Sequence, residues 1–359
     1  MIGLKKDKLL VGLDVGSYAI KAIELRPKRK EGEELFEVKK IGYEVLPHDA
    51  IVEGTIIDSA AVAETIKMVF EENKIANKNV VISISGNSVI IKKISLPSME
   101  TEELAESIIW EAKHNIPYPY EETNVDYAII KPPYETGEKT LDILLVAAKK
   151  DKISNYSNAV IQAKKNLEAI EVDVFAIQNS FEINYPEYFK EKNVAVVNLG
   201  ANITNVLIIA KGIPQLFRDL ALGGAFIAEN LSKDLNISIE DAEKLLKDLP
   251  VKDVPPEQIQ MSLNTNIQNL LDEIEKTFSF YEAVEKEEKK IEVILLAGGL
   301  AKLSNLINQF EQRFAIKTEL FNPFRRIFFD DKKLDPMFAE DMAPAFAVAT
   351  GLATRKMGK

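Results

Sequence analysis

The chain has 359 residues, of which 46% are hydrophobic and 28% are charged, and its formal net charge is −11. The length suggests two domains, and the composition is typical of a soluble globular protein. The negative net charge disfavours nucleic acid as the main partner. The absence of cysteine excludes disulfides, thiolate metal sites and cysteine nucleophiles, and only two histidines are present for zinc chemistry.

The first residues place lysines before a short apolar run, which is too short for the apolar region of a signal peptide. No later segment approaches the roughly 18 apolar residues that a membrane-spanning helix needs. We therefore expect a cytosolic protein with peripheral membrane contact at most.

The opening segment predicts a β-hairpin. One apolar run extends from Leu9 to Val15, Gly16 interrupts it, and a second run extends from Ala19 to Leu25. A strand over 36–46 and an amphipathic helix over 61–73 are expected next. We assign residues 1–79 to the core of a first lobe.

Residues 80–150 form a different kind of segment. VVISISGNSVIIKKISL predicts two strands around a Gly-Asn turn, METEELAESIIWEAKHNI a helix, and DYAII and LDILLVAAK two further strands. We expect a small inserted α+β subdomain, in which Trp110 packs in a core and His114 caps the helix C-terminus. Residues 151–190 then complete the first lobe.

The second half repeats the opening pattern over residues 191–222, with a strand, a turn at Gly200 and a returning strand. Residues 223–290 are expected to be mostly helical. Residues 291–340 continue the second lobe with a strand, the Gly298-Gly299 turn and a helix. Residues 341–359 predict a closing helix whose small residues allow close packing.

The two hairpins align without a gap. Paired in order, the equivalent residues are Asp14 with Asn198, Gly16 with Gly200, Ser17 with Ala201, Tyr18 with Asn202, and Lys21 with Asn205. A glycine-centred turn exposes consecutive backbone N–H groups, which bind phosphate oxygens. Two such turns in facing domains could hold a polyphosphate from both sides, with Lys21 adding a positive charge and Asp14 oriented toward a magnesium-bound water.

These motifs resemble those of the actin, heat-shock chaperone and hexokinase ATPase superfamily, and within it those of the type IV pilus assembly family PilM. The superfamily motifs are GLDVGSYAIKAIEL, VVNLGANITNV, LLAGGLAKL and MAPAFAVATGLATR. The PilM motifs are ISGNSVIIKKISLPSM, EELAESIIWEAKHNIPYPYEETNVDYAII, LDILLVAAKKDKI and VDVFAIQNSFE. They cover nearly the whole chain in the expected order, and the inserted segment separates this family from its division relative FtsA.

The resemblance implies an α/β, actin-like bilobed fold: two RNase H-like domains, a small inserted α+β subdomain and a helical subdomain. It also implies ATP and Mg2+ as cofactors, with Asp14 holding magnesium through water and Asn198 as a second metal candidate. The residues implied to bind the nucleotide are Gly16, Ser17, Tyr18, Lys21, Gly200, Ala201, Asn202, Gly223, Gly224, Glu243, Gly298 and Gly299.

Two positions depart from the family pattern. The second hairpin usually begins with Asp, whereas Asn198 has no negative charge and cannot act as a general base. We therefore assign no catalytic residue and expect slow or no ATP hydrolysis, although Asn198 could still orient water for slow turnover. The usual Glu-x-x-Lys helix keeps Glu243 but has Leu246 at the lysine position, and Lys244 or Lys247 could substitute from different sides of the helix.

The resemblance implies a cytoplasmic scaffold of type IV pilus assembly, peripheral to the inner membrane through the N-terminal cytoplasmic peptide of a PilN-like membrane protein. That peptide would bind a groove between the first lobe and residues 80–150, at the strand over 89–96 and the helix over 104–114. Other inner-membrane platform proteins and self-association are further partner candidates.

Two other functions stay open. An FtsA-like division or secretion scaffold would normally carry a C-terminal amphipathic membrane helix, whereas ATRKMGK directly follows the expected closing helix. A small-molecule kinase needs a carboxylate base, for which Asp173 is the nearest candidate.

Overall fold

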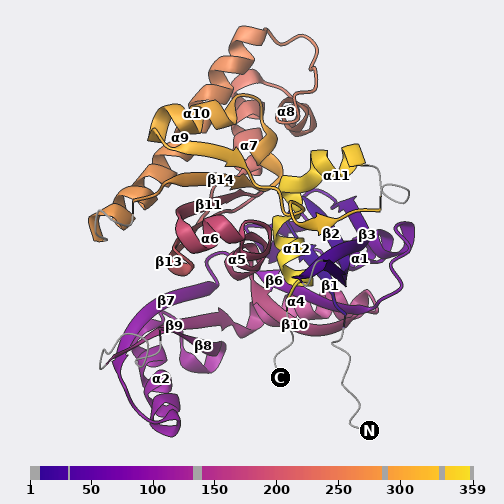
Figure 1. Cartoon of the computed structure of the whole chain (residues 1–359). Helices are drawn as coiled ribbons and strands as arrows, with labels where there is room; N and C mark the ends of the chain where they lie inside the picture. The colour runs from indigo at the N-terminus through magenta and orange to yellow at the C-terminus, as the bar shows by residue number, and fades with distance from the viewer. Residues whose placement is uncertain (1–8, 31–32, 132–139, 285–289, 331–335, 356–359) are drawn as a thin grey trace.

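The computed structural model describes residues 9–30, 33–131, 140–284, 290–330 and 336–355. Two large sheets form the centres of two lobes, and a third, smaller sheet lies to one side of them (Figure 1). The bilobed α/β architecture that the sequence predicts is confirmed.

The first sheet has the order β10-β6-β1-β2-β3-β16. Its strands are β1 (Val11–Val15), β2 (Ala19–Lys30), β3 (Glu33–Val45), β6 (Asn79–Ile84), β10 (Asn166–Val172) and β16 (Ile327–Phe328). The helices α1 (Ser59–Glu72) and α4 (Lys150–Gln162) share a buried apolar core with this sheet. A short two-stranded sheet, β4 (Ile51–Val52) with β5 (Thr55–Ile56), precedes α1, which begins where the Asp58 carboxylate accepts the Ala61 N–H.

The second sheet has the order β13-β12-β11-β14-β15. Its strands are β11 (Asn193–Leu199), β12 (Thr204–Ala210), β13 (Ile213–Leu220), β14 (Val293–Ala297) and β15 (Lys317–Leu320). Its outer face packs on helices α7 (Gly224–Leu235), α8 (Ile239–Leu245), α9 (Pro256–Val284) and α10 (Leu306–Phe314). Four other helical segments are α6 (Pro186–Glu191), η3 (Gly299–Lys302), α11 (Pro336–Met342) and η4 (Ala343–Phe346).

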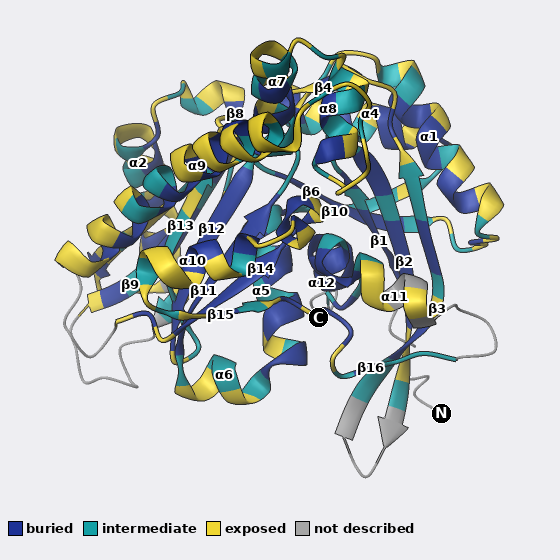
Figure 2. Cartoon of the chain, turned by 90° about the horizontal axis from the view of Figure 1, so that it is seen from above, coloured by how far each residue is buried: buried dark blue, intermediate teal, exposed yellow. Residues whose placement is uncertain are grey.

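Two helices occupy the space between the large sheets. They are α5 (Asp173–Asn184) and α12 (Ala347–Ala353), and one buried apolar cluster joins them to both sheets (Figure 2). A Cβ atom added to Gly351 would lie 1.7 Å from the Ala176 carbonyl oxygen of α5. A Cβ atom on Gly12 of β1 would lie 2.0 Å from the Ala349 carbonyl oxygen. The expected close packing of this last helix therefore depends on glycine at both contacts.

The third sheet has the order β7-β9-β8 and is covered by α2 (Thr101–Asn115). Its strands are β7 (Val89–Pro97), β8 (Thr123–Lys131), which follows the short η1 (Tyr120–Glu122), and β9 (Thr140–Lys149). The two strands expected around the Gly-Asn turn do not pair with each other, because β6 lies between β1 and β10 in the first sheet. The expected start of the insert at residue 80 thus falls inside β6, in which every residue from Val80 to Ile84 is buried, as in a strand covered on both faces.

The prediction that Trp110 packs in a core is wrong, because its side chain is 58% exposed and lies against the His114 ring, with 3.9 Å between the ring centres. The core face of α2 is formed by Leu104, Ile108 and Ala112, four residues apart, and Trp110 falls off that face. His114 Nδ1 lies 2.7 Å from the Trp110 carbonyl oxygen, in the last turn of the helix. Among the described residues, no helix is both long and apolar enough to cross a bilayer.

Candidate functional site

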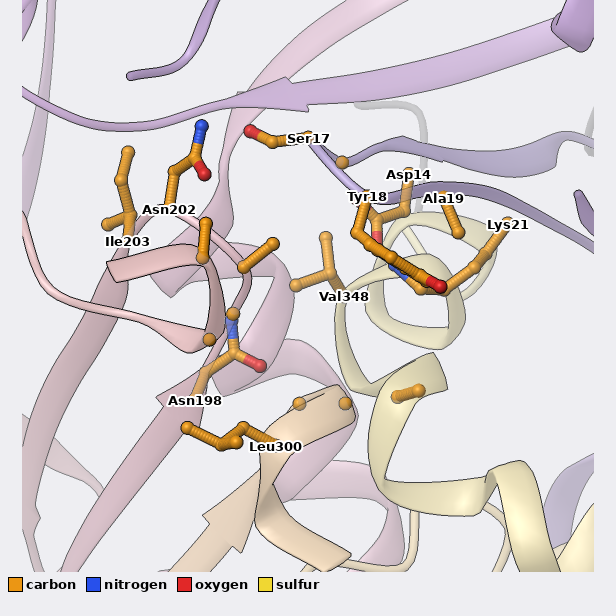
Figure 3. A pocket seen from close by; sticks show the side chains of 18 of the residues that line it. Asp14, Ser17, Tyr18, Ala19, Lys21, Asn198, Asn202, Ile203, Leu300 and Val348 are labelled. Carbon is orange, nitrogen blue, oxygen red and sulfur yellow. The ribbon is translucent and has the colours of Figure 1, made fainter. Parts of the chain in front are cut away.

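A cavity of about 670 Å³ lies between the two large sheets and is lined by both glycine hairpins, the start of α5 and η3 (Figure 3). Every residue that the sequence predicts for nucleotide or metal contact lines this cavity, except Gly223. Gly223 lies directly behind the lining, since a Cβ atom there would be 2.3 Å from the Ala201 carbonyl oxygen. The structure therefore brings residues from widely separated parts of the sequence to one place.

The two hairpins present equivalent positions with different chemistry. On β1 and β2, Asp14 lies opposite Lys21, and Lys21 Nζ is 2.8 Å from Asp14 Oδ2. On β11 and β12, Asn198 lies opposite Asn205, and Asn198 Nδ2 donates to Asn205 Oδ1 over 2.8 Å. An ion pair in the first lobe is thus replaced by an amide pair in the second.

The turns around the cavity need glycine for steric reasons. A Cβ atom on Gly200 would lie 2.5 Å from the Ile203 carbonyl oxygen that closes the hairpin. Gly298 has φ 90°, and a Cβ atom there would lie 2.2 Å from the Leu199 carbonyl oxygen. At Gly299, by contrast, nothing lies within 4 Å of the Cβ position, so this glycine borders open space that a ligand can fill.

A polar cluster at the cavity joins the two lobes. Lys247 Nζ lies 2.5 Å from the Tyr18 hydroxyl and 4.8 Å from the centre of its ring. Burial raises the pKa of Tyr43 to about 12, and the neighbouring Tyr18 and Glu243 raise it as well. Glu243 lines the cavity from the second lobe, opposite Tyr18 and Tyr43 of the first lobe.

The sequence leaves open whether Lys244 or Lys247 replaces the lysine of the usual Glu-x-x-Lys helix. Lys247 lines the cavity, whereas Lys244 pairs with Asp241, 2.7 Å away, on the exposed side of α8. The helix ends at Leu245, and the turn that follows directs Lys247 toward Tyr18. Helical periodicity could not predict the position of Lys247, because this residue lies beyond the last turn of the helix.

Asp173, the first residue of α5, also lines the cavity. Its pKa is raised to about 6, first by burial and then by the charge of Asp14. The neighbouring side chains of Ser83 and Ser85, which also line the cavity, lower the pKa, and the charge of Asp219 raises it further. The sequence analysis missed both serines, for which the only signal was their position at the end of the apolar strand β6.

Two further hydrogen bonds cross between the lobes. Asn202 Nδ2 donates to the Ile51 carbonyl oxygen over 3.3 Å. The Gly86 N–H donates to Asp219 Oδ2 over 2.6 Å. They connect the second hairpin to β4, and β13 to the turn between β6 and β7.

The oxygen atoms at the cavity fit a magnesium ion that is bound mainly by phosphate and water. Within the described ranges, no group of three or more acidic, histidine or cysteine side chains is arranged to hold a metal ion directly. Asp14 and Asn198 both line the cavity, one from each hairpin. Mg2+ commonly uses one or two carboxylates with several waters and substrate phosphates, so this donor set is suitable.

Comparison with known proteins gives a consistent result. A model of the family described as type IV pilus assembly protein PilM matches residues 12–357. Cell division protein FtsA of Bacillus subtilis (strain 168) is 22% identical over 271 residues, which cover 68% of this chain and 59% of FtsA. The match thus spans less than two thirds of that relative's length.

Solved structures show the same fold. A PilM-PilN type IV pilus biogenesis complex matches with a TM-score of 0.86 and 24% identity, covering 99% of this chain and 100% of the other. Ethanolamine utilization protein EutJ from Carboxydothermus hydrogenoformans matches at TM-score 0.57 and 13% identity, covering 97% and 90%. MreB5 of Spiroplasma citri bound to ADP matches at 0.51 and 14%, covering 96% and 94%. These likenesses establish an actin-like fold.

Proposed function

Since this chain belongs to the PilM family of type IV pilus assembly proteins, we propose that it is an actin-like scaffold that binds ATP with Mg2+ between its lobes. We also propose that it reaches the inner membrane through the cytoplasmic N-terminal peptide of a PilN-like protein. Under this proposal the protein is cytoplasmic and peripheral to that membrane.

The observation that carries the ATP proposal is the pair of glycine hairpins that face one cavity from opposite lobes. The cavity volume of about 670 Å³ falls in the range of small-molecule sites. Backbone N–H groups at both turns can bind phosphate oxygens from two sides. MreB5 structures of the same fold bound to ADP and AMPPNP support a nucleotide as the ligand.

Each lobe has a defined part in binding. Lys21, now paired with Asp14, donates to the phosphates, and Asp14 is then available to orient water on the magnesium ion. Glu243 accepts from the ribose hydroxyl groups, while the open space beside Gly299 takes the base. Magnesium supplies positive charge that neutralises the phosphate oxygens.

The Lys21→Ala variant is expected to bind ATP about 10 to 150 times more weakly than wild type. This corresponds to the loss of one charge-assisted hydrogen bond, about 1.5 to 3 kcal/mol. Titration calorimetry with magnesium and ATP measures it. Lys67→Ala is the matched control, because Lys67 pairs only with exposed Glu64 on α1 among the contacts described for it. Equal ATP affinities of the two variants would contradict the phosphate role.

Hydrolysis is expected to be slower than about 1 per second, the low end of enzyme turnover numbers. Asn198 cannot accept a proton, so Asp173 is the cavity residue to which we assign any residual proton transfer, because its pKa is about 6. A phosphate-release assay should detect little product, and Asp173→Asn should remove what remains. Turnover of about 1 per second or faster by the wild type would show that Asn198 does not limit the reaction.

Asp173 also gives the kinase alternative a specific residue, since a carboxylate with this pKa could activate an acceptor hydroxyl. Measuring ATP turnover with a panel of sugars and small acids distinguishes a small-molecule kinase from a scaffold. Turnover well above that in buffer would favour phosphate transfer to a small molecule. The likeness to FtsA keeps a division or secretion scaffold as the other alternative.

For the partner peptide, β7 offers a suitable surface. It is an edge strand in the described part of the third sheet, and Val89, Ile90 and Ile91 are half-buried. An extended peptide can add to such an edge through backbone hydrogen bonds, with apolar side chains at alternate positions. We propose that the PilN-like tail binds there, between the insert and the first lobe, with α2 contributing the second side.

A further inference from the structure

We propose that Asp219 is a positioning residue that fixes the amide of Asn198 with its oxygen toward the cavity, where it accepts a hydrogen bond from magnesium-bound water. This inference rests on the proposed binding of magnesium and ATP. It explains how the second hairpin can face the metal with an oxygen although it lacks the usual aspartate.

The three side chains form one row across the second sheet. Asn198 lies opposite Asn205, and Asn205 lies opposite Asp219, on the neighbouring strands β11, β12 and β13. Residues at directly opposed positions point to the same face of a sheet, so their side chains meet. Asn198 Nδ2 donates to Asn205 Oδ1 over 2.8 Å, and Asn205 Nδ2 donates to Asp219 Oδ1 over 2.7 Å.

The direction of these hydrogen bonds follows from the two ends of the row. A carboxylate can only accept, so the Asn205 NH2 group must face Asp219. The Asn205 oxygen then faces Asn198 and engages its NH2 group. The NH2 group of Asn198 is thereby held toward Asn205 and its Oδ1 toward the cavity, and Figure 3 shows this oxygen turned into the pocket.

Burial makes the alternative orientation unfavourable. Asn198 and Asn205 are only 9% and 2% exposed, so water cannot readily replace a lost hydrogen bond. A flipped Asn198 would place its oxygen against the Asn205 oxygen, and neither atom can donate. The hydrogen bonds of this row thus determine which end of the Asn198 amide, the oxygen or the NH2 group, faces the cavity.

The far end of the row makes the proposal testable. Asp219 Oδ2 accepts the backbone N–H of Gly86, which can only donate. If asparagine replaces Asp219, its oxygen must face Gly86 and its NH2 group must face Asn205. Every amide in the row then reverses, and Asn198 presents a donor to the cavity.

The two orientations differ in how they respond to metal. An NH2 group can bind phosphate oxygens without magnesium, whereas an oxygen repels phosphate and favours the waters of the metal. The informative quantity is therefore the magnesium enhancement, defined as the ratio of the ATP dissociation constants without and with Mg2+.

The experiment compares this enhancement by calorimetry in the wild type, Asp219→Asn and the exchange variant Asn198→Asp/Asp219→Asn. We expect the enhancement to fall at least tenfold in Asp219→Asn, while affinity without Mg2+ does not fall. The exchange variant keeps the total charge and has only acceptors at position 198, so it should regain the wild-type enhancement. Asp234→Asn is the control for the substitution, because Asp234 accepts from Ser262 in the helical part of the second lobe.

A wild-type enhancement in Asp219→Asn would overturn the proposal. So would an equal loss of affinity with and without Mg2+, which indicates a structural role only, or a folded exchange variant that behaves like Asp219→Asn.

Exchange of the Asn198 side-chain NH2 protons with solvent, followed by NMR in the nucleotide-free protein, gives a second reading. These protons should exchange slowly in the wild type and faster in Asp219→Asn, and unchanged rates would contradict the orientation. Wild-type protein that binds no ATP would contradict the proposed function, while the exchange rates would still decide the orientation of Asn198.

Discussion

Replacing residues 89–148 with two glycines is expected to abolish binding of the PilN-like tail and to leave ATP affinity within about twofold of wild type. The structure allows this deletion because the Lys149 N–H donates to the Ser88 carbonyl oxygen over 3.0 Å, so the two ends of the insert are adjacent. Strand β6 and the contact of Gly86 with Asp219 stay in place. A deletion that starts at residue 80 would instead remove a strand from the first sheet.

The measurement is fluorescence anisotropy with a labelled peptide that copies the tail. Wild type should bind with micromolar affinity or better, which corresponds to about 8 kcal/mol. ATP calorimetry and circular dichroism on the deletion variant serve as the control for folding. A folded variant that binds the tail as tightly as the wild type would place the docking surface outside the insert, and recruitment would have to be sought on the second lobe.

Asp173→Asn is expected to stabilise the nucleotide-free protein by about 3 kcal/mol at neutral pH. The pKa of Asp173 rises from 3.8 to about 6 on folding, so the folded state favours the protonated carboxyl. That contribution is fully present below pH 4 and is lost as the pH rises to 6 and above. An asparagine is neutral throughout, so the two proteins should be similarly stable near pH 4 and diverge between pH 4 and 7.

Urea unfolding at several pH values measures this difference, with Asp234→Asn as the control for the chemical change. A constant difference from pH 4 to 8 would show that Asp173 does not titrate as the structure implies. Because the charge of Asp14 contributes to the shift, Asp14→Asn should reduce the pH dependence contributed by Asp173.

The elements that sequence could predict are those set by local patterns. The hairpin at Gly16, its copy at Gly200 and the Gly298-Gly299 turn each follow a short apolar run, and all of them line the cavity. Pairing between distant strands has no such local signal. The segment VVISISGNSVI reads equally well as a hairpin or as two strands of different sheets, and only tertiary contacts assign β6 to the first sheet.

Site residues were missed where their position depends on register or on the end of a helix. Asp219 carries no motif, and it reaches the second hairpin because β13 pairs with β12 in one particular register. Lys247 follows the last turn of α8, so helical periodicity could not choose it over Lys244. The position of Asp219 depends on strand register and that of Lys247 on where a helix ends, and local sequence patterns specify neither.

The contact between α5 and α12 links the cavity to the space between the two large sheets. Gly351 meets the Ala176 carbonyl oxygen without a side chain, so the two helix backbones touch directly at this point. Since α5 begins at Asp173 in the cavity, one helix carries both a cavity residue and this contact. Packed helices move relative to each other by small shear steps, and we expect a ligand that displaces Asp173 to act on the second lobe and the first through this helix pair.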